Sequence, residues 1–139
     1  MSGSTASDTG WAIEGMEVSR DGRDVVMAVP DTDYRLHLVA AEGLVADERG
    51  ELRGVIRADA KRVDVITGGG RYVEPVIGRP RRVQGRIVGG EGSTGSIVVR
   101  AGVGTLVCRL TDPRQSLADF SVGQLVSFDV LRGARLEPA

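Results

Sequence analysis

The sequence predicts an all-β protein, built as two small five-stranded barrels in tandem with one short helix near residues 112–120. Short apolar runs rich in valine, isoleucine and leucine recur about every ten residues, a spacing typical of all-β folds. The 20 glycines and five prolines of the 139-residue chain indicate many turns between these runs. The two halves of the chain also carry the same order of runs and turns.

Ten runs are the expected strands, five in each half. Each is short, has β-type residues and is bounded by glycine, aspartate or proline. Between the third and fourth runs of the second half, Asp112 is a suitable N-cap and Pro113 a suitable first helical residue, which predicts the short helix. The expected strands are 16–20, 25–29, 34–39, 52–57 and 62–66, then 83–88, 97–101, 106–111, 125–131 and 135–137.

The two halves can be laid over each other without gaps. Residues 25–39 align on 97–111, and residues 50–64 align on 123–137. The identical pairs include Gly50 with Gly123 and Leu52 with Leu125. Both an ancestral duplication and a shared strand pattern explain so few identities, and either one predicts two similar units.

The expected organisation therefore has four parts. Residues 1–10 are small and polar and predict a disordered tail. The first β unit covers 11–65, a Gly/Arg/Pro-rich connector covers 66–80, and the second β unit covers 81–139. Units of about 55 residues bury only thin cores, so we expect the two to pack together or to pair between chains.

The closing segment DFSVGQLVSFDVLRGARLEP, residues 119–138, places a glycine turn before a strand of the form V-x-F-x-V. This pattern resembles the last two strands of OB-fold proteins, small five-stranded barrels. The resemblance is clearest over 81–139 and weaker over 11–65. It implies a binding module, but the aromatic strand motifs of cold-shock domains are absent, so no binding residues follow from it.

Alternation along the expected strands predicts which side chains face the core. In 34–39, Tyr34, Leu36 and Leu38 share the inner face, whereas Arg35 and His37 point outward. The same reasoning in the later strands adds a further set of expected core residues. These are Val98, Cys108, Leu110, Val126, Phe128 and Val130.

No residue pattern predicts catalysis, a metal or a cofactor. The segment GEGSTG, residues 90–95, matches a dinucleotide motif but precedes a strand, whereas that motif requires a helix. His37 is the only histidine and lacks partner ligands, and Cys108 is the only cysteine. A single cysteine without a secretory signal favours a reducing, cytoplasmic setting. We expect a protein that is not an enzyme and uses no cofactor.

Charge is divided unevenly along the chain. Residues 1–51 hold eleven acids and four arginines, whereas residues 52–109 hold eleven bases and four acids. The segment 68–86 carries five arginines against the single acid Glu74. It has two interpretations: a strap for anions such as nucleic-acid phosphates, or a connector whose arginines pair with the acidic first half. The candidate binding residues are Arg71, Tyr72, Arg79, Arg81, Arg82 and Arg86, with the outward strand residues Arg35, Arg100 and Arg109.

The function expected from the sequence is a non-enzymatic interaction module that binds a protein partner or self-associates. The alternative is a nucleic-acid-binding OB-fold protein that uses the Arg-rich segment 71–86. The shortage of aromatic residues disfavours the alternative, because OB-fold proteins that bind single strands stack bases on exposed aromatic rings. No apolar run is long enough to span a membrane, so no membrane partner is expected.

Overall fold

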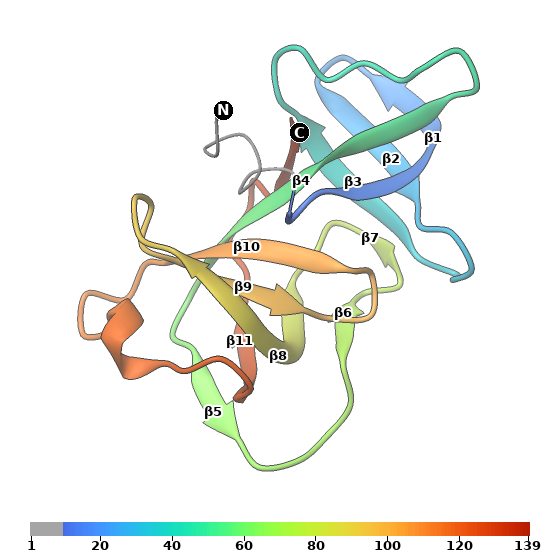
Figure 1. The fold of residues 1–139 in the computed structure, drawn as a ribbon. Coiled ribbons are helices and arrows are strands. Elements are labelled where there is room, and N and C mark those ends of the chain that lie inside the picture. Colours follow the sequence, from blue (N-terminus) through green and yellow to red (C-terminus); the bar gives the residue numbers. More distant parts are fainter. Residues whose placement is uncertain (1–9) are drawn as a thin grey trace.

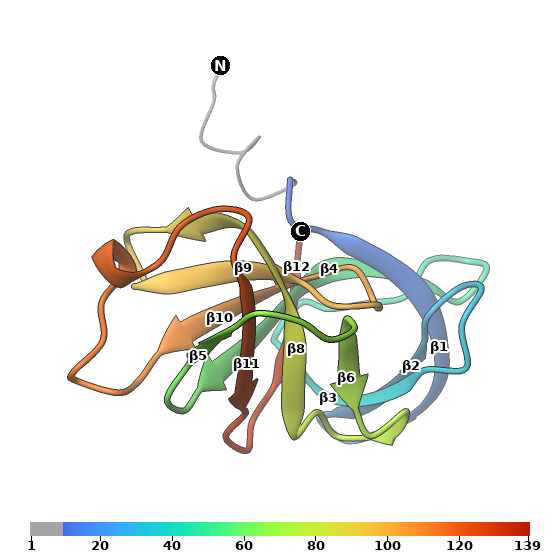
Figure 2. The same cartoon turned by 90° about the horizontal axis from the view of Figure 1, so that it is seen from below.

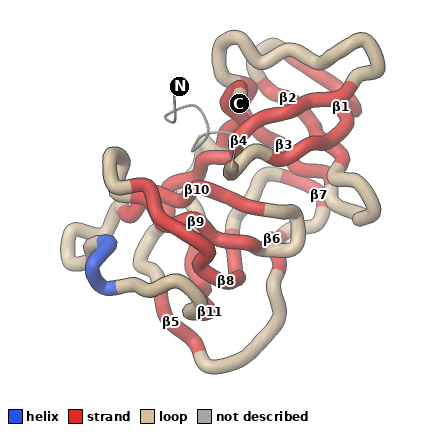
Figure 3. The backbone as a smooth tube through the Cα atoms, viewed as in Figure 1, coloured by secondary structure: helices blue, strands red, loops and turns tan. Residues whose placement is uncertain are grey.

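The computed structural model describes residues 10–139 as strands joined by loops and turns, with a single short helical turn (Figures 1 and 3). The predicted disordered tail, 1–10, lies outside the described residues except for Gly10. One continuous sheet contains all the strands of the described range. In chain order they are β1 (Ile13–Asp21), β2 (Asp24–Ala28), β3 (Arg35–Ala40), β4 (Glu51–Ala60), β5 (Asp64–Ile66), β6 (Tyr72–Glu74), β7 (Ile77–Gly78), β8 (Arg82–Glu91), β9 (Ser96–Arg100), β10 (Thr105–Leu110), β11 (Leu125–Asp129) and β12 (Arg135–Pro138).

Five of these strands close into a barrel in the order β1-β2-β3-β12-β4, and β4 pairs back with β1. The β3–β12 contact is parallel and the other four are antiparallel. β12 thus completes a barrel whose other strands come from the first sixty residues. In Figure 2, β12 and β4 lie between β1–β3 on one side and β8–β11 on the other.

Strict alternation explains how the barrel wall forms. In β3, Leu36 and Leu38 are buried while Arg35 and His37 are exposed, as the sequence predicts. In the neighbouring β2, Val25 is fully buried. Because successive side chains point to opposite faces of a strand, this pattern presents one apolar face to the barrel interior.

β4 extends beyond the barrel and joins it to the rest of the sheet. Its residues from Ile56 to Ala60 pair in parallel with β10. From there the sheet runs β10-β9-β8-β11-β5, and a bridge between Ala60 and Val130 brings the end of β4 back beside β11. Strand pairing therefore crosses between the two predicted units at both β4 and β12, and the proposed unit boundaries stay a prediction.

One large apolar cluster runs through both parts of the sheet. Of the residues predicted to face the core, Tyr34 and Leu110 are only partly buried and pack against this cluster, whereas the others are confirmed as buried. A smaller cluster of Val55, Val98 and Val107 lies under Trp11. The confirmed residues are Leu36, Leu38, Val98, Cys108, Val126, Phe128 and Val130.

Two glycines allow strands to cross closely. A Cβ atom on Gly54 of β4 would lie 2.4 Å from the carbonyl oxygen of Glu137, and one on Gly85 of β8 would lie 2.2 Å from that of Arg100. Real side chains cannot tolerate such distances, so both positions require glycine for the sheet to bend and close.

The predicted helix near 112–120 is wrong in extent: only the turn η1 (Leu117–Asp119) is helical, and it is a 3-10 turn. Asp112 does not cap a helix, because its carboxylate accepts the backbone N–H of Arg114 two residues later. Gln115 then bonds the backbone N–H and C=O of Val63 at 2.9 and 2.8 Å. These bonds hold the segment against the strand connection at Val63 in place of helical bonds. Across 10–139, no helix has the length and apolar character needed to cross a lipid bilayer.

Candidate anion-binding site

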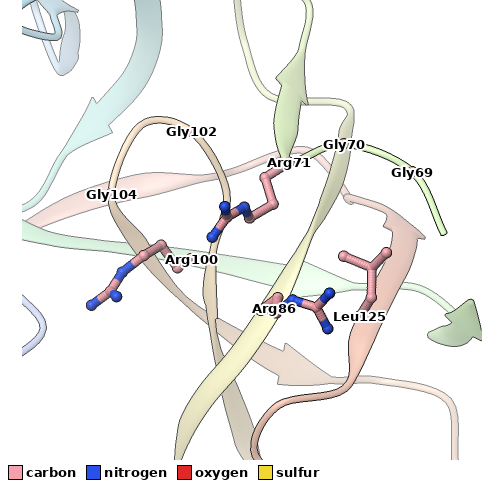
Figure 4. Close-up of a pocket in the computed structure, with 8 residues that line it drawn as sticks. All are labelled: Gly69, Gly70, Arg71, Arg86, Arg100, Gly102, Gly104 and Leu125. Carbon is pink, nitrogen blue, oxygen red and sulfur yellow. The ribbon is translucent and has the colours of Figure 1, made fainter. Parts of the chain in front are cut away.

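Three arginines lie together around a cavity of about 580 Å³ on the surface of the β8–β9 region. We call Arg71, Arg86 and Arg100 the arginine row (Figure 4). The sequence singles out all three as candidates, although 29 residues separate the first from the last. The rest of the lining is Gly69, Gly70, Gly102, Gly104 and Leu125.

The sheet register brings two of these arginines together. Arg86 of β8 and Arg100 of β9 are direct partners across the antiparallel pair. Residues opposite each other project from the same face of a sheet, and like charges in such a pair destabilise it. Both side chains are exposed, so solvent reduces this repulsion without removing it.

Arg71 is positioned by the strand that follows it. Tyr72 of β6 pairs with Gln84 of β8, and its hydroxyl donates to Gln84 Oε1 at 3.0 Å. Gln84, which is buried, donates from Nε2 to the carbonyl oxygen of Gly70 at 2.9 Å. The buried Gln84 amide therefore bonds both neighbours of Arg71, the backbone of Gly70 and the side chain of Tyr72.

The glycines of the lining leave the cavity without side chains at these positions. Gly102 and Gly104, in the β9–β10 hairpin, have φ values of +76° and +109°. At Gly102 a Cβ atom would lie 3.2 Å from the carbonyl oxygen of Arg71, so the hairpin and the Arg71 loop are close neighbours. A bound group could therefore approach the backbone here without meeting a side chain.

The row has no internal counter-charge. Within 10–139, none of its three guanidinium groups has a carboxylate within salt-bridge distance. Arg86 donates only to the backbone carbonyl of Gly123, at 2.8 Å. Figure 4 shows that Arg71 lies between the other two, which extend to opposite sides. In this view the three guanidinium groups therefore do not converge on one point.

A second group of arginines without a carboxylate partner among residues 10–139 lies beside β3. Arg79 and Arg132 line a cavity of about 400 Å³ beside β3, which we call the β3 pocket. Partial burial, followed by the positive charges of Arg132 and Arg81, lowers the pKa of Arg79. Like charges thus lie close together in this pocket too.

The other predicted site residues have partners or lie apart. Arg82 pairs with Asp129 at 2.7 Å, and Arg109 pairs with Asp59 at 2.9 Å. Arg35 is exposed on β3 and lines neither cavity, and Tyr72 is half-buried in its bond to Gln84. Within 10–139, Arg82 is the only arginine of segment 68–86 that pairs with an acid, and Asp129 is not in the acidic first half.

Sequence reasoning misses Arg132 and the role of the glycine hairpin. Arg132 stands in a turn with Gly133, and a single exposed arginine in a turn carries no pattern. The hairpin could have been found from Gly102 and Gly104, which stand close together between two predicted strands. The sequence does not reveal that Arg132 lies beside Arg79, or that the glycine hairpin lies beside Arg71.

Two further observations concern the cysteine and the metal-ligand residues of the described part of the chain. Burial, with a smaller effect from Asp59, raises the pKa of the Cys108 thiol far above its ordinary value, so this thiol is unreactive. Over the same residues, no group of three histidine, cysteine or carboxylate side chains could hold a metal ion. Comparison with family models, with curated proteins and with solved structures finds no match.

Proposed function

We propose that this protein is a non-enzymatic binding module that holds nucleic acid by its phosphate backbone. The observation that carries the proposal is the arginine row. Arg86 and Arg100 stand directly opposite each other, Arg71 is held between them by a buried amide, and no carboxylate of the described residues neutralises them.

A bound polyanion would offset the unfavourable electrostatics of the row. A direct like-charge pair costs a few tenths to about 1 kcal/mol in a sheet. Guanidinium groups form charge-assisted, bidentate hydrogen bonds with phosphate. Because the three guanidinium groups do not converge on one point, several phosphates of a strand match them better than one small anion.

The surroundings favour contact with phosphates over contact with bases. Of the aromatic residues described, Trp11, Tyr34, Tyr72 and Phe120 are half-buried and Phe128 is buried. No fully exposed ring is therefore available for base stacking. Binding through phosphates alone positions the nucleic acid but does not read its sequence.

The fold supports the same class of function. We assign the closed ring β1-β2-β3-β12-β4 as an OB-like barrel in which β12 takes the place of the fifth strand. We further assign β8–β11 as a second OB-like unit, completed by the end of β4 and by β5. In this arrangement each unit takes a closing strand from the other half of the chain.

The test is the salt dependence of binding to a short DNA duplex. Wild-type protein should bind with a slope of log affinity against log salt near −2.7, which is about −0.9 for each of three phosphate contacts. Arg100→Ala should reduce the slope by about 0.9, and the triple alanine variant should nearly abolish it. All variants should keep the wild-type melting temperature within a few degrees, because the side chains are exposed.

Arg49→Ala is the matched control. It removes the same charge from a side chain that is 81% exposed and lies outside the row. If Arg49→Ala weakens binding as much as Arg100→Ala does, only net charge matters and the row is not a site. Equally tight binding of polyglutamate would show that an acidic protein is the partner, and no binding at low salt would reject the row altogether.

A protein partner is the second candidate, and one surface favours it. Val76 and Ile77, between β6 and β8, are adjacent and 46% and 64% exposed. Where neighbouring apolar side chains form a contiguous exposed patch, that patch is a candidate contact surface. Self-association through this pair predicts that Ile77→Asp shifts the sedimentation coefficient of the wild type toward that of the monomer.

A further inference from the structure

We propose that the β3 pocket binds a phosphate monoester or inorganic phosphate, separately from the arginine row. The pocket is lined by donors from three elements: His37 of β3, Arg79 of the β7–β8 connection and Arg132 of the β11–β12 connection. Buried Pro80, Leu38 and Ala134 form the apolar part of its wall.

The pocket contains positive charge that the protein does not neutralise. Within 10–139, neither Arg79 nor Arg132 has a carboxylate oxygen within 4 Å. Arg79 is half-buried, and the exposed Arg81 stands close enough to add its own repulsion. Holding Arg79 among these charges is unfavourable until an anion occupies the space.

The arrangement of donors favours phosphate over a carboxylate. Two guanidinium forks and an imidazole reach the pocket from separate strands and connections. A carboxylate is planar and carries a single negative charge, so it would balance only one of the two arginines. A phosphate monoester presents three terminal oxygens in a tetrahedral arrangement, and its charge of about −1.5 to −2 balances the two arginines.

Asp24 also lines the pocket and opposes a bound anion. It lies at the start of β2, opposite Val39 of β3, and its side chain is exposed. The Asp24 carboxylate repels the anion and so lowers its affinity. Removing this charge should therefore strengthen phosphate binding, whereas removing an arginine should weaken it.

The experiment is calorimetric titration of the full chain with inorganic phosphate at low salt. Wild-type protein should bind saturably, Arg132→Ala should bind about tenfold or more weakly, and Asp24→Asn should bind about twofold or more tightly. Arg132 is exposed in a connection, so its loss should leave the fold intact. Arg49→Ala, at an arginine outside both the β3 pocket and the arginine row, should leave phosphate binding unchanged.

Two sources of the phosphate are distinguished with a DNA strand carrying or lacking a 5′-phosphate. A terminal phosphate as the natural ligand predicts that the phosphorylated strand binds more tightly and that Arg132→Ala removes the difference. A free phosphate monoester predicts no difference between the strands, while Arg132→Ala still weakens inorganic phosphate. The proposal is wrong if wild type binds no phosphate, or if wild type and Arg132→Ala bind it equally. Neither result depends on the arginine row.

Discussion

Replacing Leu136 by alanine is expected to destabilise the whole described sheet, although Leu136 lies in β12, the last strand of the chain. Leu136 is fully buried and lies between Ala40 of β3 and Ile56 of β4. It therefore fills the barrel at the point where β12 completes the ring.

The size of the effect follows from the surroundings of this side chain. The three carbon atoms removed, Cγ and the two methyl groups, are worth about 0.8 kcal/mol each, or about 2.4 kcal/mol in total. The cavity left behind adds to this, because Gly54 offers no side chain to fill it and β12 is hydrogen-bonded on both edges. We expect a loss of about 3–5 kcal/mol, within the range for leucine-to-alanine changes in cores.

Two probes in the molecule test this in one denaturant titration. Trp11, the single tryptophan, packs over Val55 of β4, and Cys108, the single cysteine, is buried in β10. Because β4 belongs to both parts of the sheet, tryptophan fluorescence and thiol reactivity should report the same unfolding midpoint. Leu136→Ala should lower that midpoint equally for both probes. Leu131→Ala, at a 37% exposed leucine, should cost less than about 1 kcal/mol. A loss below about 1 kcal/mol for Leu136→Ala, or two separate transitions, would refute a barrel closed by β12.

Three further predictions concern other parts of the chain. Phe128→Ala should cost about 3–5 kcal/mol in chemical denaturation, because Phe128 is among the largest fully buried side chains, and a loss near zero would contradict its placement. The Arg114 guanidinium, followed by the Arg114 backbone N–H, lowers the pKa of Asp112 to about 2, so Arg114→Ala should raise that pKa toward 3.8 in an NMR titration. Since the folded pKa is lowered, any stability from Asp112 is present above its unfolded pKa and lost as pH falls through about 2. Native Cys108 should resist a thiol reagent at about pH 8, and rapid labelling without unfolding would show that β10 is open.

Local patterns in the sequence predict the strands but not all of their neighbours. Alternation in 34–39 places Leu36 inside and His37 outside, because the period of two is a property of the strand itself. The place of β12 in the sheet is not predictable in this way. Nothing within 135–137 shows that Leu136 packs beside Ala40 and not beside a strand nearer in the sequence, since the apolar pattern suits either position. The helix fails for a related reason: Asp112 and Gln115 favour turn and long-range bonds that only the folded chain supplies.

The sequence predicts which residue type forms the candidate site, but it does not predict which arginines lie together. The excess of arginine between 68 and 86 marks a candidate anion-binding segment, with pairing to the acidic first half as the alternative. The pairing of Arg86 with Arg100 depends on the β8–β9 register, and that register includes a bulge between Ile87 and Gly89. The approach of Arg71 depends on Gln84, whose amide gives no signal of its role in the sequence.

The late position of β12 has a consequence for synthesis on the ribosome. About 75 residues separate the end of β4 from the start of β12, which corresponds to about 4–15 s of translation. During that time β3 and β4 are made but their shared neighbour is not, so both present unpaired backbone groups that invite pairing with other chains. A nascent chain stalled before Arg135 should therefore bind chaperones and aggregate on release, whereas a chain released after β12 should fold.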